Sequence, residues 1–101
     1  MVAITKPVNL RRAAQADLVA AGDWYERARP GLAVRFTAAV QQAFDLIGDR
    51  PQLYAVLDRD VRSAAVPGFP YRVYYRERPS AVVVLAVLHT SRDPSVWQSR
   101  S

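Results

Sequence analysis

The stretch FPYRVYYRERPSAVVVLAVLH, residues 69–89, decides the architecture that this sequence predicts. Residues 71–76 alternate two sets of side chains, as expected of a strand that shows a different set to each face of a sheet. A turn sequence at residues 78–80 separates this strand from residues 81–88, which are apolar throughout. An apolar run of this length predicts a central strand that is covered on both faces.

Further strands are expected upstream of this pair. Residues 59–66 have strand character and are followed by the turn sequence Pro67-Gly68, so they complete a three-stranded antiparallel meander. Near the start of the chain, residues 8–11 predict a short edge strand set off by Pro7. The sheet therefore draws its strands from both ends of the sequence.

Residues 13–28 predict a helix. Apolar side chains recur along it at steps of three and four residues, which is the spacing of one helix face. This stripe consists of Ala14, Leu18, Ala21 and Tyr25. Trp24 lies beside the stripe, and we expect it to be a packing anchor because aromatic side chains bury the most surface.

A second amphipathic helix is expected over residues 32–47. Gly48 stands where a helix C-cap is expected, and Pro51 prevents continuation of the helix. The short link between the two helices makes them an antiparallel hairpin. The sequence thus predicts a single α+β domain over residues 1–101: a strand, a helical hairpin and a three-stranded antiparallel meander, with the helices packed on one face of the sheet.

Composition indicates a globular, cytoplasmic protein. Half of the residues are hydrophobic, 23% are charged, and there are no cysteines, so no disulfide or thiolate metal site is expected. The sequence MVAITKPVNL at the start has no apolar region of signal-peptide type. The longest apolar run, residues 81–88, is too short to cross a bilayer, and we expect no membrane partner.

Positive charge is concentrated in the second half of the chain. The net charge is +5, and residues 59–101 hold seven basic and three acidic side chains, against seven and six in residues 1–58. Thirteen of the 14 cations are arginine, which pairs bidentately with phosphates and carboxylates. Two interpretations stay open: a surface for nucleic acid or an acidic protein, or an ordinary solvated basic face.

His89, the only histidine, directly follows the central strand. Its imidazole titrates near neutral pH, so it is a candidate acid or base; the alternative is a structural hydrogen bond that closes the strand. With no second histidine, no cysteine and no tight carboxylate cluster, we expect neither a metal site nor a nucleophile–base–acid triad. The sequence also lacks a glycine-rich phosphate loop, and no cofactor is expected.

Three arginines are candidates for binding an anion. Arg62 and Arg72 lie on strands joined by a short turn, which can bring them close across the hairpin. If both share a face with Arg92, the three guanidiniums form a site for a phosphate or an acidic partner. The alternative is that each is an ordinary exposed arginine.

The order of these segments resembles that of toxins of the ParE/RelE superfamily of bacterial type II toxin–antitoxin systems. The resemblance rests on the tripeptide Ala-Asp-Leu at residues 16–18, the Gly-x-x-Pro sequence at the end of the second helix, residues 48–51, and the strand that carries Arg62. It continues through FPYRVYY and VVVLAVLH to the closing RDPSVW at residues 92–97. It covers nearly the whole chain, from about Val8 to Trp97.

Membership of this superfamily implies one of two activities. RelE-type toxins cut messenger RNA in the ribosome, and a nuclease of this kind would use Arg72, Arg92 and His89 as its candidate catalytic residues. Trp97 stands near the place where several of these nucleases carry a tyrosine, and an indole cannot exchange a proton at neutral pH. ParE-type toxins instead inhibit DNA gyrase and need no chemical step of their own.

The ending LAVLHTSRDPSVW is more similar to ParE-type members. The resemblance therefore implies a gyrase-directed toxin that acts by binding, forms a hetero-oligomer with a cognate antitoxin, and belongs to a plasmid-stabilisation type of gene pair. The alternatives are a ribosome-dependent mRNA endoribonuclease and a non-toxic nucleic-acid-binding module. The residues expected to contact the target or the antitoxin are Arg62, Arg72, His89, Arg92 and Trp97. We hypothesise that the buried strand presents the last three at one end of the sheet.

Overall fold

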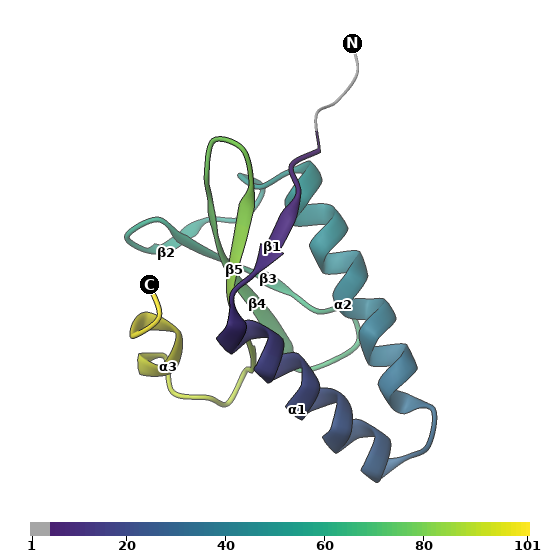
Figure 1. The fold of residues 1–101 in the computed structure, drawn as a ribbon. Coiled ribbons are helices and arrows are strands. Elements are labelled where there is room, and N and C mark those ends of the chain that lie inside the picture. The colour runs from purple at the N-terminus through teal and green to yellow at the C-terminus, as the bar shows by residue number, and fades with distance from the viewer. Residues whose placement is uncertain (1–4) are drawn as a thin grey trace.

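A five-stranded sheet forms the centre of the computed structural model, which describes residues 5–101 (Figure 1). Its strands are, in chain order, β1 (Val8–Leu10), β2 (Val56–Asp58), β3 (Val61–Ala65), β4 (Tyr71–Glu77) and β5 (Val82–His89). Across the sheet the order is β1-β5-β4-β3-β2. β1 runs parallel to β5, and the other neighbours are antiparallel, so the sheet is mixed.

Two long helices cover one face of this sheet: α1 (Arg12–Ala28) and α2 (Leu32–Asp49). A short third helix, α3 (Ser95–Gln98), packs on the other face through its tryptophan. The predicted α+β class, the helical hairpin and the antiparallel meander are confirmed. β2 and α3 were not predicted, since β2 has three exposed residues and α3 only one turn. No helix within residues 5–101 is long and apolar enough to cross a membrane.

The predicted central position of β5 is confirmed. It lies between β1 and β4, and nearly every side chain along it is buried. Tyr74 pairs with Ala86 whereas Tyr75 pairs with Val84, so Leu85 is an extra residue in a β-bulge. The bulge turns the consecutive side chains of Leu85 and Ala86 to the face that α3 covers. The apolar run is unbroken because both faces of the strand are buried.

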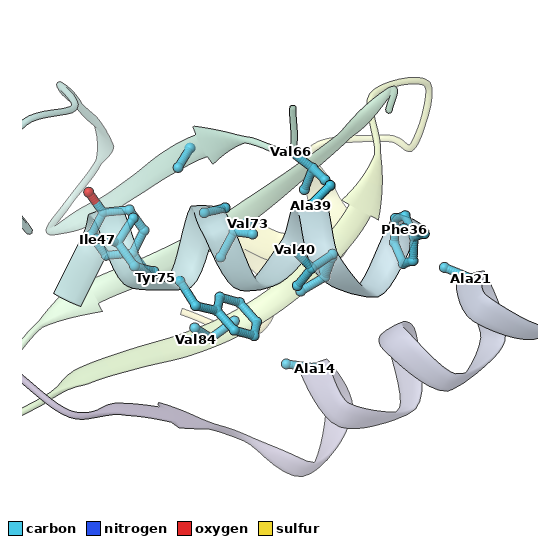
Figure 2. Close-up of a cluster of buried hydrophobic side chains, with 14 of the residues drawn as sticks. Ala14, Ala21, Phe36, Ala39, Val40, Ile47, Val66, Val73, Tyr75 and Val84 are labelled. Carbon is cyan, nitrogen blue, oxygen red and sulfur yellow. The ribbon is translucent and has the colours of Figure 1, made fainter. Parts of the chain in front are cut away.

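Two apolar clusters hold the layers together. The larger cluster lies between the sheet and the helices (Figure 2). Its fully buried large side chains include Phe36, Ile47, Val73, Tyr75 and Val84. The smaller cluster lies on the α3 face and consists of Val61, Tyr74, Leu85, Ala86, Leu88 and Trp97. Both faces of the central strand are therefore covered by apolar side chains.

Gly48 is not the predicted helix cap. α2 continues to Asp49, and the C-cap is Arg50. A Cβ at Gly48 would lie 2.8 Å from the backbone oxygen of Lys6, whose own N–H donates to the Gly48 carbonyl at 2.9 Å. The glycine is required because the segment before β1 approaches the helix backbone closely.

Trp24 is not the predicted packing anchor. Its side chain is 57% exposed and touches Tyr25 edge-on, with ring centroids 5.1 Å apart. The buried positions of α1 are Ala14, Ala21 and Tyr25, and position 24 lies to one side of that stripe. A large aromatic side chain is therefore displayed on the surface of the first helix.

Candidate functional site

Two adjoining hollows open where the end of β5 meets α1. One has a volume of about 200 Å³ and is lined in part by Asp17, Trp24, Tyr71, His89 and Arg92. The other has a volume of about 460 Å³ and shares the two aromatic rings and the histidine with the first. We call the two together the His89 hollow.

Strand pairing places Tyr71 and His89 side by side in this hollow. Tyr71 of β4 pairs with His89 of β5, and their rings meet edge to face with centroids 5.4 Å apart. The imidazole Nδ1 accepts a hydrogen bond from the Ser91 N–H at 3.0 Å. A neutral ring in this arrangement carries its proton on Nε2, which leaves one N–H available as a donor. The structural interpretation of His89 is thus supported, and one ring nitrogen is left for a ligand.

Arg92 follows on the turn after β5. Its backbone N–H donates to the His89 carbonyl at 3.0 Å, which brings the side chain to the hollow. Within residues 5–101, no carboxylate lies within ion-pair distance of its guanidinium. Burial raises the pKa of Tyr71 above its ordinary value, and the neighbouring charge of Arg92 opposes that rise.

Asp17 is a site residue that the sequence reasoning missed. β1 pairs with β5 only as far as Val84, so the rest of that strand edge has no neighbouring strand. The Asp17 carboxylate binds to that unpaired edge. It accepts a hydrogen bond from the Val87 N–H at 3.0 Å and pairs with Arg100 at 2.6 Å. The only feature of the sequence that pointed to Asp17 was the position of a carboxylate beside an apolar helix stripe, within the tripeptide Ala-Asp-Leu.

Arg62 and Arg72 do not come together. Arg62 pairs with Tyr75 on the helix-covered face and donates a hydrogen bond to the backbone carbonyl of Tyr54. Arg72 pairs with Ala65, three residues further along β3, and alternation places it on the opposite face. There its Nε donates to the Ser63 hydroxyl at 2.8 Å. The expected cluster of three guanidiniums does not form.

Trp97 is not presented with His89 and Arg92. It is 7% exposed and stacks on Tyr74, with ring centroids 5.1 Å apart and an interplanar angle of 13°. The turn after β5 reverses the chain and carries α3 onto the other face of the sheet, so Trp97 is a core residue there. Of the three residues expected at one end of the sheet, only the first two line a common hollow.

The described part of the chain offers no metal centre. Within residues 5–101, no group of three His, Cys, Asp or Glu side chains is close enough to hold a metal ion. The polar groups of the His89 hollow are one imidazole, two phenols, one indole N–H, one guanidinium and a carboxylate that is already paired. This set can hold an anion or orient a planar group.

Sequence comparison identifies the family. Residues 8–94 match the family described as the ParE toxin of the type II toxin–antitoxin system parDE. The chain belongs to this family. It is a toxin of the ParE/RelE superfamily, as predicted. The matched region includes His89 and Arg92 and ends before Trp97.

Solved structures resemble this ParE-family chain. A chain of the chromosomal ParDE system from P. aeruginosa superimposes with a TM-score of 0.74 and 18% identity, over 84% of this chain and 96% of that one. A chain of the RelBE2 toxin–antitoxin complex from Mycobacterium tuberculosis gives a TM-score of 0.59 and 25% identity, over 85% and 92%. No curated protein matches the sequence. These likenesses agree with the α+β architecture of the superfamily.

Proposed function

We propose that this ParE-family toxin acts by binding DNA gyrase, without a chemical step of its own, and that a cognate antitoxin neutralises it. The observation that carries the proposal is the separation of the candidate catalytic groups. Arg72 lies on the α3 face and is held by Ser63, whereas His89 and Arg92 lie in a hollow beside α1. A nuclease needs its phosphate-binding and proton-transfer groups around one reacting phosphate.

The aromatic residues also favour binding over chemistry. Trp97, near the place where several of the nucleases carry a tyrosine, is buried against Tyr74 and has no group that exchanges a proton near pH 7. Burial raises the pKa of Tyr75 to about 12, and its hydroxyl donates to the Pro51 carbonyl. His89 is the single histidine of the sequence.

The distribution of charge suits a large, negatively charged target. Residues 59–101 carry four more positive than negative charges, which favours encounter with a gyrase–DNA complex. Binding to the cleaved-DNA state of gyrase would stabilise that state and block replication. The antitoxin is proposed because both similar solved structures come from toxin–antitoxin systems.

A ribosome-dependent nuclease is the second candidate. Its support is the RelBE2 likeness, which has the higher identity of the two at 25%. In that case His89 and Arg92 would act together, and Arg72 would contact RNA from the other face.

Incorporation of labelled thymidine and amino acids, followed separately in the first minutes after controlled induction, tests the proposal. We expect DNA synthesis to fall first, and purified toxin to increase gyrase-cleaved plasmid DNA in vitro. Early loss of translation, with no effect on gyrase, would replace the proposal with the nuclease. Arg92→Gln tests whether this arginine contributes to toxicity and does not by itself distinguish the two targets, since it could serve either one. Arg78→Gln, at an arginine whose side chain is 51% exposed in a long ion pair, is its matched control.

A further inference from the structure

The His89 hollow displays a large aromatic side chain that the fold does not use. Trp24 is 57% exposed, although it lies next to the core. Ala20 and Ala21, one turn before it on α1, have side chains too small to fill the space between the helix and the end of β5. The wall on the other side consists of Tyr71 and Pro70. The result is an apolar recess with an accessible indole at its rim.

The His89 hollow also carries a positive charge that no carboxylate among the described residues neutralises. Its carboxylate, Asp17, is already neutralised by Arg100 and the Val87 N–H. Arg92 has no carboxylate partner among residues 5–101. Its neighbour Asp93 is directed elsewhere, since it accepts a hydrogen bond from the Ser95 N–H at 2.9 Å. The hollow therefore presents net positive charge to a ligand.

We propose that the His89 hollow is a docking site for an acidic partner polypeptide. One aromatic or large aliphatic side chain of the partner packs against Trp24 and Tyr71, and an adjacent carboxylate pairs with Arg92. The remaining N–H of His89 is a further donor for that carboxylate. An anchor side chain in a recess with a charged group at its rim is the usual composition of an interface hot spot. The inference rests on the proposed function only in taking a protein as the partner.

The lining favours a polypeptide over nucleic acid. Besides the aromatic side chains and His89, it is formed by apolar atoms of the two alanines, Pro70, Val87 and Leu88, by the already paired Asp17 and by a single guanidinium. Nucleic-acid binding draws its affinity from several phosphate contacts along a basic track. One arginine next to an apolar recess fits one carboxylate next to one apolar side chain instead.

Blocked dipeptides make direct probes of this arrangement. Acetyl-Phe-Glu-amide is titrated into the ¹⁵N-labelled full chain, and the signals of the two indole N–H groups and the His89 region are followed by NMR. We expect saturable shifts at Trp24 and His89 and none at the buried Trp97. Acetyl-Phe-Gln-amide and acetyl-Ala-Glu-amide each lack one half of the proposed ligand, and we expect them to bind at least five-fold more weakly.

Substitutions test which residue of the hollow binds the carboxylate of the probe and which binds its aromatic side chain. Arg92→Gln should reduce binding of the Phe-Glu probe to that of the Phe-Gln probe, whereas the control Arg78→Gln should not change it. Trp24→Ala should abolish saturable binding, whereas Val34→Ala, at a 73% exposed position of α2, should preserve it. An unchanged Trp97 signal shows in each case that the fold persists.

Three outcomes would overturn the inference: equal shifts with all three dipeptides, shifts scattered away from the hollow, or an octadeoxynucleotide that binds the same signals more tightly than the Phe-Glu probe. The dipeptide series on the unsubstituted chain tests the proposed docking site even if a variant fails to fold. Because gyrase is absent from this experiment, its result is independent of the toxicity assay, and either proposal can fail while the other stands.

Discussion

The carboxylate of Asp17 in α1 lies 2.6 Å from the guanidinium of Arg100, which is 83 residues away in the sequence. The same guanidinium reaches the Leu85 carbonyl at the bulge of β5, and Arg11 donates to the Arg100 carbonyl at 3.0 Å. These contacts tie the first helix, the central strand and the end of the chain to one point. They also satisfy the strand edge that β1 is too short to cover.

We expect Asp17→Ala to destabilise the protein by about 2–4 kcal/mol. The substitution leaves the Val87 N–H and the half-buried Arg100 without their partner, and an orphaned charge with a buried donor costs more than a surface contact. Urea unfolding measures the effect. Asp23→Ala, at an exposed position of the same helix, is the control and should change the free energy of unfolding by less than about 0.5 kcal/mol. Equal effects of the two substitutions would contradict this account of the Asp17 contacts.

The two tryptophans should differ strongly in the stability that is lost on truncation. Trp97→Ala removes a stacked, 7% exposed side chain from the smaller cluster, and we expect a loss of about 3–5 kcal/mol. Trp24→Ala removes a side chain that is 57% exposed and should cost less than about 1 kcal/mol. Thermal unfolding of both variants checks the order, and a larger loss at Trp24 would show that the exposures assigned to them are reversed.

Two helical glycines offer a matched comparison. Gly48→Ala places a methyl group 2.8 Å from the Lys6 carbonyl oxygen, so we expect it to destabilise the protein by about 1–3 kcal/mol. Gly22→Ala meets nothing within 4 Å and improves the helix propensity of α1, so it should stabilise by up to about 1 kcal/mol. Denaturant midpoints give the sign of each change. A neutral or stabilising Gly48→Ala would mean that the segment before β1 does not approach α2 as described.

Tyr75 should make stability sensitive to alkali. Burial raises its pKa from 10.0 to about 12, so the unfolded chain ionises more readily than the native one. The stability that arises from this pKa difference of Tyr75 is fully present below pH 10 and is lost as pH rises from about 10 towards 12. Tyr75→Phe should remove part of this alkaline loss, at a cost of about 1 kcal/mol at pH 8 for the hydrogen bond to Pro51. Urea unfolding at pH 8, 10 and 11 tests this, and identical pH profiles of the two chains would argue against it.

The layers of the fold could be predicted because their signals are local. The apolar run at residues 81–88 indicated the central strand, and the stripes of the two helices indicated which faces pack on the sheet. Gly48 shows the limit of such signals. A glycine near a helix end is typical of a cap, and only the approach of Lys6 from a distant segment reveals its different role.

The candidate site could be predicted only in part. His89 and Arg92 lie within four residues of each other, so strand and turn geometry sufficed to place them together. Arg62 and Arg72 required the pairing register, which separates them onto opposite faces of the sheet. The two tryptophans were both misplaced, because exposure depends on what packs over a position and not on the size of the side chain.

The sequence by itself determined the order of elements, the amphipathic faces, the superfamily and the excess of positive charge, since each of these follows from residues near one another in the chain. Only the tertiary structure decided which candidate residues meet. The parallel pairing of β1 with β5, the bulge at Leu85 and the contact of Asp17 with Arg100 join segments more than 70 residues apart or depend on strand register. Periodicity carries no information about such pairings, because it repeats identically whichever partner a strand or helix finds.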